Sequence, residues 1–182
     1  YQALLQKWSR RINLVAPRTL DESWSRHFAD SAQILDLAPV QTRTWTDMGT
    51  GAGFPGLVVA ILRPEITVTL IESDERKSAF LRTVIRETGA RANVLTDRIE
   101  DVVPQRADVV SARALAPLNT LLAYAHRHLD PSGTALFPKG RQFRAELGQR
   151  AAVLIFCDNQ MPESTFSSHE KHRRFAPFSI SR

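Results

Sequence analysis

Asp47-Met48-Gly49-Thr50-Gly51-Ala52-Gly53-Phe54-Pro55-Gly56 is the stretch of sequence that decides the fold. It follows a short run with strand character and leads into an apolar run, residues 57–62, with helical character. Glycine permits positive φ and has no Cβ, so a ligand can approach the backbone closely, and the first N–H groups of the following helix are free to bind it. Pro55 suits the first turn of that helix. The stretch therefore predicts a strand, loop and helix that bind a nucleotide-like cofactor.

Two cofactor classes compete for this loop. Residues 51–56 match the dinucleotide pattern G-x-G-x-x-G, which alone is weak evidence. In a dinucleotide site the first glycine sits at the strand end, whereas Asp47 takes that place here and Gly49 follows two residues later. Acid-x-Gly-x-Gly-x-Gly resembles the first motif of S-adenosylmethionine (AdoMet) methyltransferases, in which the carboxylate can meet the cofactor's amino group directly or through water. The third alternative is a glycine-rich turn that binds nothing.

A second acidic residue supports a cofactor that carries a ribose. Residues 66–71 are β-branched and apolar, as in a buried parallel strand, and they end at Glu72. An acid about 20 residues beyond the glycines is where a ribose diol is bound. Glu72 could instead be a solvated strand end or pair with Arg76. We favour the ribose role.

Length and composition indicate one domain. A chain of 182 residues with 43% hydrophobic content can bury a substantial core, and we expect a methyltransferase-like domain over 1–150, with a helical segment at 1–38 and a divergent or poorly ordered segment at 151–182. One cysteine excludes an intramolecular disulfide, and no apolar window is long enough to span a bilayer. We expect a soluble, cytoplasmic protein. Cys157, His169 and His172 lack an evident fourth ligand, so no metal site is predicted.

The order of elements predicts an α/β fold with a mostly parallel sheet and helices on both faces. The resemblance of the glycine-rich loop to the first motif of AdoMet methyltransferases implies the Rossmann-like class I AdoMet-dependent methyltransferase type of this fold. Helices are expected at 77–87, ending at Gly89, and at 118–129. Strands are expected at 93–96, 108–112, 134–137 and 153–156, with a turn at 131–133. Ligands bind at the carboxyl ends of the strands in such sheets. The carboxyl ends of these strands and of the two earlier ones, before the glycine-rich stretch and at 66–71, carry Asp47, Glu72, residues 97–100, Arg113 and Lys139. His126 and His128 are expected at the surface.

The net charge of +5 and the isoelectric point near 10.0 indicate a polyanionic partner. Basic residues gather along the chain before, beside and after the glycine-rich stretch, where they could form one phosphate-binding face. The alternative is a set of solvated helix faces. The candidate RNA-binding residues are Arg10, Arg11, Arg18, Arg26, His27, Arg76, Lys77, Lys139 and Arg141.

A set of short motifs between about Trp8 and Gly140 is specific as a combination: Asn13-Leu14, Arg26-His27, Asp30-Ser31, the stretch 47–56, Arg76-Lys77, Phe80-Leu81-Arg82, Arg98-Ile99-Glu100, Ser111, Arg113-Ala114 and Lys139-Gly140. In these motifs the sequence resembles one family, the bacterial 16S ribosomal RNA guanine-N7 methyltransferases, also called glucose-inhibited division protein B. The resemblance implies that AdoMet binds through Gly49, Phe54, Ile99, Glu100 and Arg113, in addition to Asp47, Gly51, Gly53 and Glu72 proposed from the residues themselves. It also implies a guanine at about position 527 of 16S rRNA as the target, in free RNA or in the small ribosomal subunit.

This chemistry needs no general base, because guanine N7 has an unprotonated lone pair at neutral pH. Arg113 and Lys139 are candidates for positioning the reactants, while His27 is expected to be structural or to contact RNA. Two other functions remain open, a nicotinamide-dependent oxidoreductase and an RNA-binding module without activity. We expect a monomer.

Overall fold

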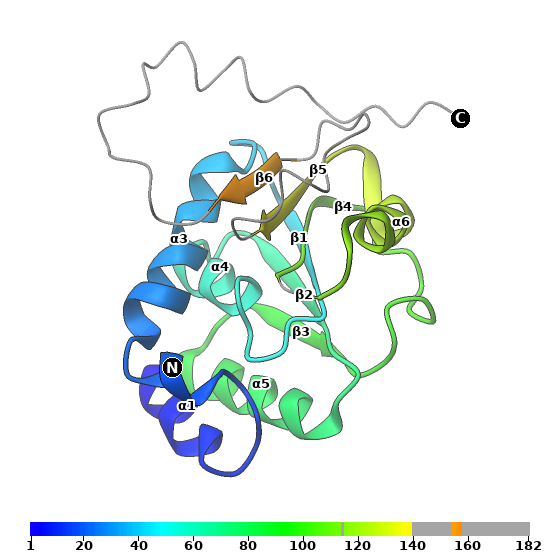
Figure 1. The fold of residues 1–182 in the computed structure, drawn as a ribbon. Helices are drawn as coiled ribbons and strands as arrows, with labels where there is room; N and C mark the ends of the chain where they lie inside the picture. The colour runs from blue at the N-terminus through cyan, green and yellow to red at the C-terminus, as the bar shows by residue number, and fades with distance from the viewer. Residues whose placement is uncertain (114, 140–153, 158–182) are drawn as a thin grey trace.

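A parallel sheet forms the centre of the molecule (Figure 1). The computed structural model describes residues 1–113, 115–139 and 154–157, and within them six strands lie in the order β3-β2-β1-β4-β5-β6. The order reverses between β1 and β4, and ligands of such sheets bind at the carboxyl ends of the strands beside this reversal. The strands are β1 (Thr44–Met48), β2 (Thr67–Ile71), β3 (Ala92–Leu95), β4 (Ala107–Ser111), β5 (Leu129–Lys139) and β6 (Leu154–Cys157).

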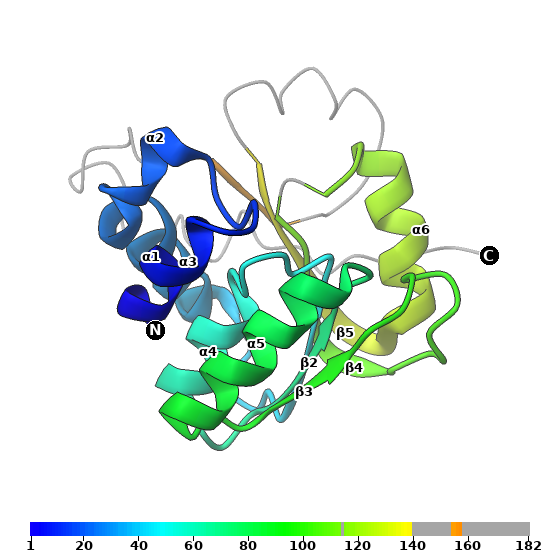
Figure 2. The ribbon, with the colours of Figure 1, turned by 90° about the horizontal axis from the view of Figure 1, so that it is seen from below.

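Helices cover both faces of the sheet, as predicted (Figure 2). The N-terminal elements and the two crossover helices that follow β1 and β2 pack on one face, and α6 packs on the other. The N-terminal helical segment that the sequence indicated for 1–38 is divided into five short pieces. The helices are α1 (Gln2–Ser9), α2 (Pro17–Leu20), the π-helix η1 (Trp24–Ala29), α3 (Asp30–Gln33), the 3₁₀-helix η2 (Ile34–Leu37), α4 (Gly56–Leu62), α5 (Glu75–Thr88) and α6 (Leu118–His128).

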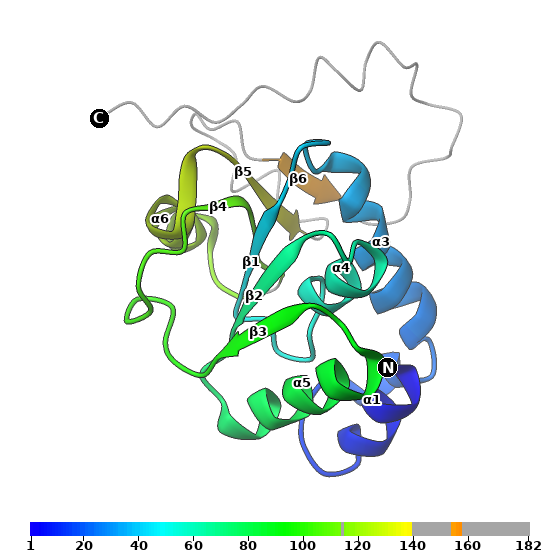
Figure 3. The same ribbon diagram turned by 180° about the vertical axis from the view of Figure 1, so that it is seen from behind.

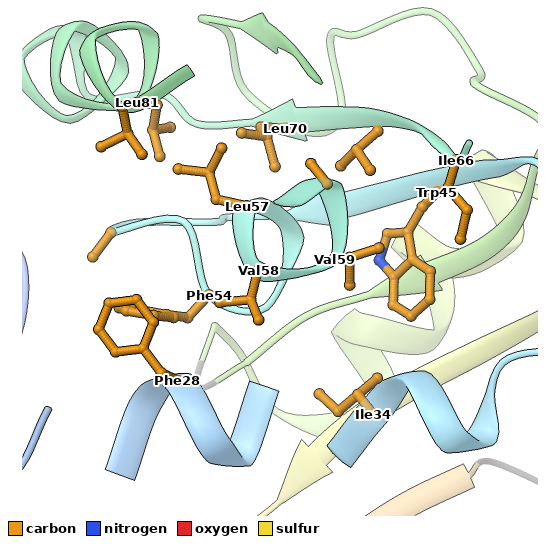
Figure 4. Packing of buried hydrophobic residues seen from close by; sticks show 14 of the residues in the cluster. Phe28, Ile34, Trp45, Phe54, Leu57, Val58, Val59, Ile66, Leu70 and Leu81 are labelled. Atoms are coloured by element: carbon orange, nitrogen blue, oxygen red, sulfur yellow. The ribbon is translucent and has the colours of Figure 1, made fainter. Parts of the chain in front are cut away.

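The alternation of side chains along each strand divides the core in two. Val68 and Leu70 of β2 pack on the face covered by α4 and α5, whereas Ile71 faces the side covered by α6. Figure 4 shows the larger core, in which the side chains of α4 lie between Leu70 on the sheet side and Phe28 on the N-terminal side. Burial on both faces explains why these strands are almost continuously apolar.

The crossover helix α5 begins and ends where its sequence indicates. The side chain of Asp74 accepts hydrogen bonds from the backbone N–H groups of Arg76, at 2.8 Å, and of Lys77, at 3.2 Å, which caps the first turn. At the other end Gly89 adopts φ of +67°, the left-handed conformation that terminates many helices. The predicted stop at Gly89 is confirmed.

The last strands differ from the sequence prediction. The turn expected at 131–133 lies inside β5 as an irregularity, because Ala107 pairs with Leu129 whereas Val109 pairs with Thr134. Asp130 folds these extra residues by accepting hydrogen bonds from the backbone N–H and hydroxyl of Ser132. At the sheet edge β6 pairs in parallel with β5 (Figure 3). The expected domain boundary at 150 and most of the segment 151–182 lie outside the described residues.

None of the described helices combines the length and the apolar composition that a membrane crossing requires.

Gly56 is expected to be indispensable for the contact between α4 and the sheet. A Cβ there would lie 2.4 Å from Leu70 Cδ2 and 2.7 Å from Asp47 Cβ. We predict that Gly56→Ala lowers the free energy of unfolding by about 1–3 kcal/mol through overpacking, measured by urea denaturation. Alanine would otherwise stabilise a helix by about 0.5–1 kcal/mol relative to glycine, so a variant as stable as the wild type would contradict this close contact.

Candidate functional site

The glycine-rich loop between β1 and α4 runs through three residues in the left-handed region. Gly49, Gly51 and Gly53 have φ of +60°, +57° and +91°, a conformation that other residues adopt only with strain. A Cβ at Gly51 would meet nothing closer than Gly49 O, 3.9 Å away, so the loop leaves open space at this position. At Gly53, by contrast, a Cβ would collide with Leu57. The loop is thus packed on one side and open at Gly51.

Asp47, the last but one residue of β1, holds this loop to the sheet. Its Oδ2 accepts hydrogen bonds from the hydroxyl of Thr50 and from the backbone N–H of Gly56, at 3.0 Å. Its Oδ1 accepts a 2.6 Å bond from the hydroxyl of Ser111, which in turn accepts from the indole N–H of Trp45 at 2.8 Å. One carboxylate therefore joins β1, the loop, the start of α4 and the end of β4.

The structure adds a second role to the one that the sequence suggested for Asp47. The residue is 0% exposed and both carboxylate oxygens accept hydrogen bonds from the protein, while the expected contact with a cofactor amino group, directly or through water, stays a prediction. Burial raises the pKa of Asp47, and the hydrogen bonds from Ser111, Thr50 and Gly56 oppose that shift. Asp47 shapes the loop from behind.

Glu72 follows β2 and faces the same loop. Its Oε2 accepts a hydrogen bond from the backbone N–H of Gly51 at 2.8 Å, and its Oε1 accepts one from Asp74 N at 2.9 Å. The residue is 7% exposed, which contradicts the alternative of a solvated strand end. The other alternative was an ion pair between Glu72 and Arg76. The guanidinium of Arg76 instead lies 3.8 Å from the carboxylate of Asp74. The carboxylate lies beside the open position of the loop, where a ribose could reach it.

Ile99 and Glu100 lie in a turn after β3. Ile99 is buried, and its carbonyl oxygen accepts a 2.9 Å hydrogen bond from His128 Nε2. Glu100 is exposed, and hydrogen bonds from the backbone and from Arg98 lower its pKa. Arg127 also holds this turn, since its Nη2 lies 3.0 Å from the carbonyl oxygen of Val102.

The prediction that His128 lies at the surface is wrong. His128 is 0% exposed, and its pKa is lowered by burial. The last turn of α6 packs against the turn that contains Ile99, and the histidine fixes the carbonyl there. The neighbouring His126 is exposed, as expected. Both histidines lie in the last turn of an amphipathic helix, so the sequence gives no signal that distinguishes the buried His128 from the exposed His126.

Arg113 comes two residues after β4, on the same edge of the sheet. Its Cζ lies 4.9 Å from the centre of the Phe54 ring, a cation–π contact. Burial lowers the pKa of Arg113, although an arginine remains charged at neutral pH. The ring of Phe54 is buried among Tyr1 and Phe28, with ring centres 5.3 and 5.1 Å away, so Phe54 can offer a cofactor mainly its backbone.

His27 lies next to Arg113 and is neutral. Its Nδ1 lies 3.2 Å from Arg113 Nη1, and its Nε2 lies 3.0 Å from Thr19 Oγ1. Desolvation and the charge of Arg113 lower the pKa of His27 to about 4. With its basic nitrogen occupied by a guanidinium, this histidine is poorly suited to be a general base, which agrees with the structural role expected for it.

The other candidate RNA-binding residues are spread over several elements, and their common role stays a prediction. Arg26 is exposed and forms an ion pair with Glu22. Lys139 is the last residue of β5, and Arg141 lies outside the described residues. Arg10 and Arg11 follow α1, Arg18 lies on α2, and Arg76 and Lys77 lie in the first turn of α5.

The sequence did not indicate the roles of the residues that support the site from behind. Ser111 and Trp45 complete the network around Asp47, and Thr19 holds His27. A serine at the end of an otherwise apolar strand was the one available signal for Ser111. The partner of His27 could not be found, because Thr19 lies eight positions earlier in the chain and the spacing gives no recognisable pattern.

The lowered pKa of His27 predicts how stability depends on pH. In the folded protein the imidazole stays neutral down to about pH 4, whereas in the unfolded chain it gains a proton below its ordinary value of 6.5. His27 therefore stabilises the fold above pH 6.5, and this contribution is lost as the pH falls toward 4. We predict that the free energy of unfolding falls less steeply over this range in His27→Asn than in the wild type, measured by urea denaturation. Parallel curves would contradict the neutral, half-buried imidazole.

Solved structures with a related fold are methyltransferases. A SAM-dependent O-methyltransferase from Thermotoga maritima gives a TM-score of 0.55 at 16% identity, covering 75% of this chain and 49% of that one. TYW2 of M. jannaschii, solved with AdoMet, gives 0.54 at 18% identity, covering 62% and 52%. At these identities the likeness concerns the fold alone, and it confirms the predicted fold class.

Sequence comparison defines the family. "Ribosomal RNA small subunit methyltransferase G" of Rhodospirillum centenum is 60% identical over 148 residues, 81% of this chain and 68% of that protein. The protein of the same name from Paramagnetospirillum magneticum is 49% identical over 166 residues, 91% of this chain and 80% of that protein. A family model described as rRNA small subunit methyltransferase G matches residues 1–176, further in both directions than the span from Trp8 to Gly140. The chain therefore belongs to the rRNA small subunit methyltransferase G family, whose members are AdoMet-dependent enzymes.

Proposed function

We propose that this protein transfers the methyl group of AdoMet to N7 of a guanine in 16S rRNA, at about position 527. The observation that carries the proposal is the loop itself, open at Gly51 and bordered by the Glu72 carboxylate, in a member of this methyltransferase family. The family is the one that the motif combination indicated.

The residues around the loop fit AdoMet. Glu72 offers a carboxylate for the ribose diol, and the positive charge of Arg113 suits the carboxylate of the methionine moiety. Gly49 and Gly51 let a ligand approach the backbone. His128 holds the carbonyl of Ile99 in the turn that also contains Glu100, where an adenine edge could be read. When bound, AdoMet supplies an electrophilic methyl group.

The chemistry requires positioning more than proton transfer. Guanine N7 carries a lone pair in the plane of the ring, so no base has to remove a proton before it attacks. Holding the reactants in line can supply about 7–11 kcal/mol of the barrier reduction. The neutral His27, whose Nδ1 faces Arg113, agrees with a mechanism that needs no general base. Arg113 and Lys139 are the chain's candidates for holding the reactants.

The alternative of a nicotinamide-dependent oxidoreductase loses its support. It rested on the pattern at 51–56, and the chain belongs to a methyltransferase family. The transfer experiment below distinguishes an enzyme from an RNA-binding module without activity. We further propose that the protein works in the cytoplasm as a monomer and recognises RNA through its excess of basic residues.

Incubation with methyl-labelled AdoMet and small ribosomal subunits that lack this modification tests the proposal. N7-methylguanine is then mapped by borohydride reduction and aniline cleavage. We expect a single new cut near position 527. Salt-dependent binding to the subunits without any transfer would instead indicate the RNA-binding module, and transfer to another base would contradict the assigned target.

A substitution at Gly51 tests the loop. We predict that Gly51→Ala weakens AdoMet binding at least tenfold, about 1.4 kcal/mol, because the added methyl enters the open space at the loop. Its φ of +57° should lower the free energy of unfolding by about 1–2 kcal/mol, so the protein still folds. Gly51→Val should weaken binding further, at a higher conformational cost. Gly89→Ala, also at positive φ with nothing within 4 Å, is the matched control, and unchanged AdoMet affinity in Gly51→Ala would contradict the assigned loop.

A further inference from the structure

A chain of polar contacts connects the N-terminal helical segment to the end of β4. It runs from the carbonyl of Ala16 through Thr19 and His27 to Arg113. We propose that His27 is a positioning residue for methyl transfer, which holds the Arg113 guanidinium in the orientation that AdoMet binding requires. This inference rests on the proposed function, since it assumes that Arg113 contacts the cofactor.

The direction of every hydrogen bond in this chain is determined. A guanidinium can only donate, so Arg113 Nη1 donates to His27 Nδ1 over 3.2 Å. The proton of the neutral imidazole must then lie on Nε2, which donates to Thr19 Oγ1 over 3.0 Å. The hydroxyl of Thr19 donates to the carbonyl oxygen of Ala16 over 2.8 Å. Thr19 thereby fixes the tautomer of His27, and this tautomer leaves Nδ1 free to accept from Arg113.

The ring of Phe54 restricts the same guanidinium from a second direction. Arg113 Cζ lies 4.9 Å from the ring centre of Phe54, and the imidazole of His27 lies 5.3 Å from that centre. One contact therefore limits the plane of the guanidinium and the other holds one of its nitrogens. Because Phe54 belongs to the glycine-rich loop, Arg113 is placed relative to the expected cofactor site by two neighbours.

Desolvation and neighbouring charges keep His27 in the neutral form. Desolvation has the largest effect, and Arg113 from the end of β4 and Arg26 from its own helix η1 also disfavour a positive imidazole. Asp30, Asp47 and Tyr1 act on Arg113 itself. A protonated His27 would present an N–H to Arg113 instead of a lone pair, which would break the contact. His27 also lies in a π-helical segment, a conformation often found at functional sites.

Two amide variants of the 182-residue chain separate the two contacts of His27. The side-chain oxygen of asparagine can replace Nδ1 and accept from Arg113, whereas glutamine reaches the position of Nε2 and keeps only the contact with Thr19. AdoMet dissociation constants are measured by calorimetry, with kcat and KM for AdoMet on small ribosomal subunits. His126→Gln, at an exposed position of α6, is the matched control.

We expect His27→Gln to raise the AdoMet dissociation constant and KM about tenfold, as the loss of a hydrogen bond to a charged group predicts, while His27→Asn stays within about threefold of the wild type. Thermal midpoints of the two variants should be similar, because both remove the same ring. Equal affinities of the two variants, whether both unchanged or both reduced, would overturn the positioning role.

Failure of the inference and failure of the proposed function give different results. If the wild type does not bind AdoMet, the proposed function is contradicted. Long-range ¹H–¹⁵N spectra of the unliganded protein test the contact itself without any cofactor. A proton on Nε2 and a pKa near 4 that rises in Arg113→Gln support it. A proton on Nδ1 overturns it.

Discussion

The buried carboxylate of Asp47 is the interaction on which the rest of the site depends. This side chain of β1 accepts hydrogen bonds from Thr50 in the loop and from Gly56 in the first turn of α4. A third hydrogen bond, from the hydroxyl of Ser111, connects it to the end of β4. A buried charge is costly unless it is fully hydrogen-bonded, and here hydroxyl and N–H donors surround it. Gly56 is required because any Cβ at this position would occupy the space of that carboxylate. The shape of the loop thus follows from a constraint behind it.

The N-terminal segment completes the site from the other side. The hydroxyl of Tyr1 donates to the carbonyl of Ala52, and its ring stacks on Phe54. His27 and Thr19 bring a second hydrogen-bonded chain to Arg113. The glycine-rich loop therefore lies between a network anchored in the sheet and a cluster anchored in the first helices, which explains how a loop of small residues can hold one conformation.

The sequence contains enough information for the fold and for a candidate site at the carboxyl ends of the strands, and less for the roles of individual side chains. Periodicity and β-branched runs define the strands and α5, and Gly89 marks a helix end, because these signals are local. Side-chain partners distant in sequence, such as Asp47 with Ser111 or His128 with Ile99, are created by the fold and leave no spacing to recognise. The sequence accordingly suggested a cofactor contact for Asp47, which stays a prediction, and gave no sign that the same buried carboxylate also supports the loop.

Amide chemical shifts during titration with S-adenosylhomocysteine provide the most direct test of the central claim, that AdoMet binds on the loop supported by Asp47. The account predicts that the amides of Gly49, Gly51 and Gly53 shift together with those of Ile99 and Glu100. Shifts confined to residues far from the carboxyl ends of β1, β2 and β4, or no shifts at saturating ligand, would contradict it.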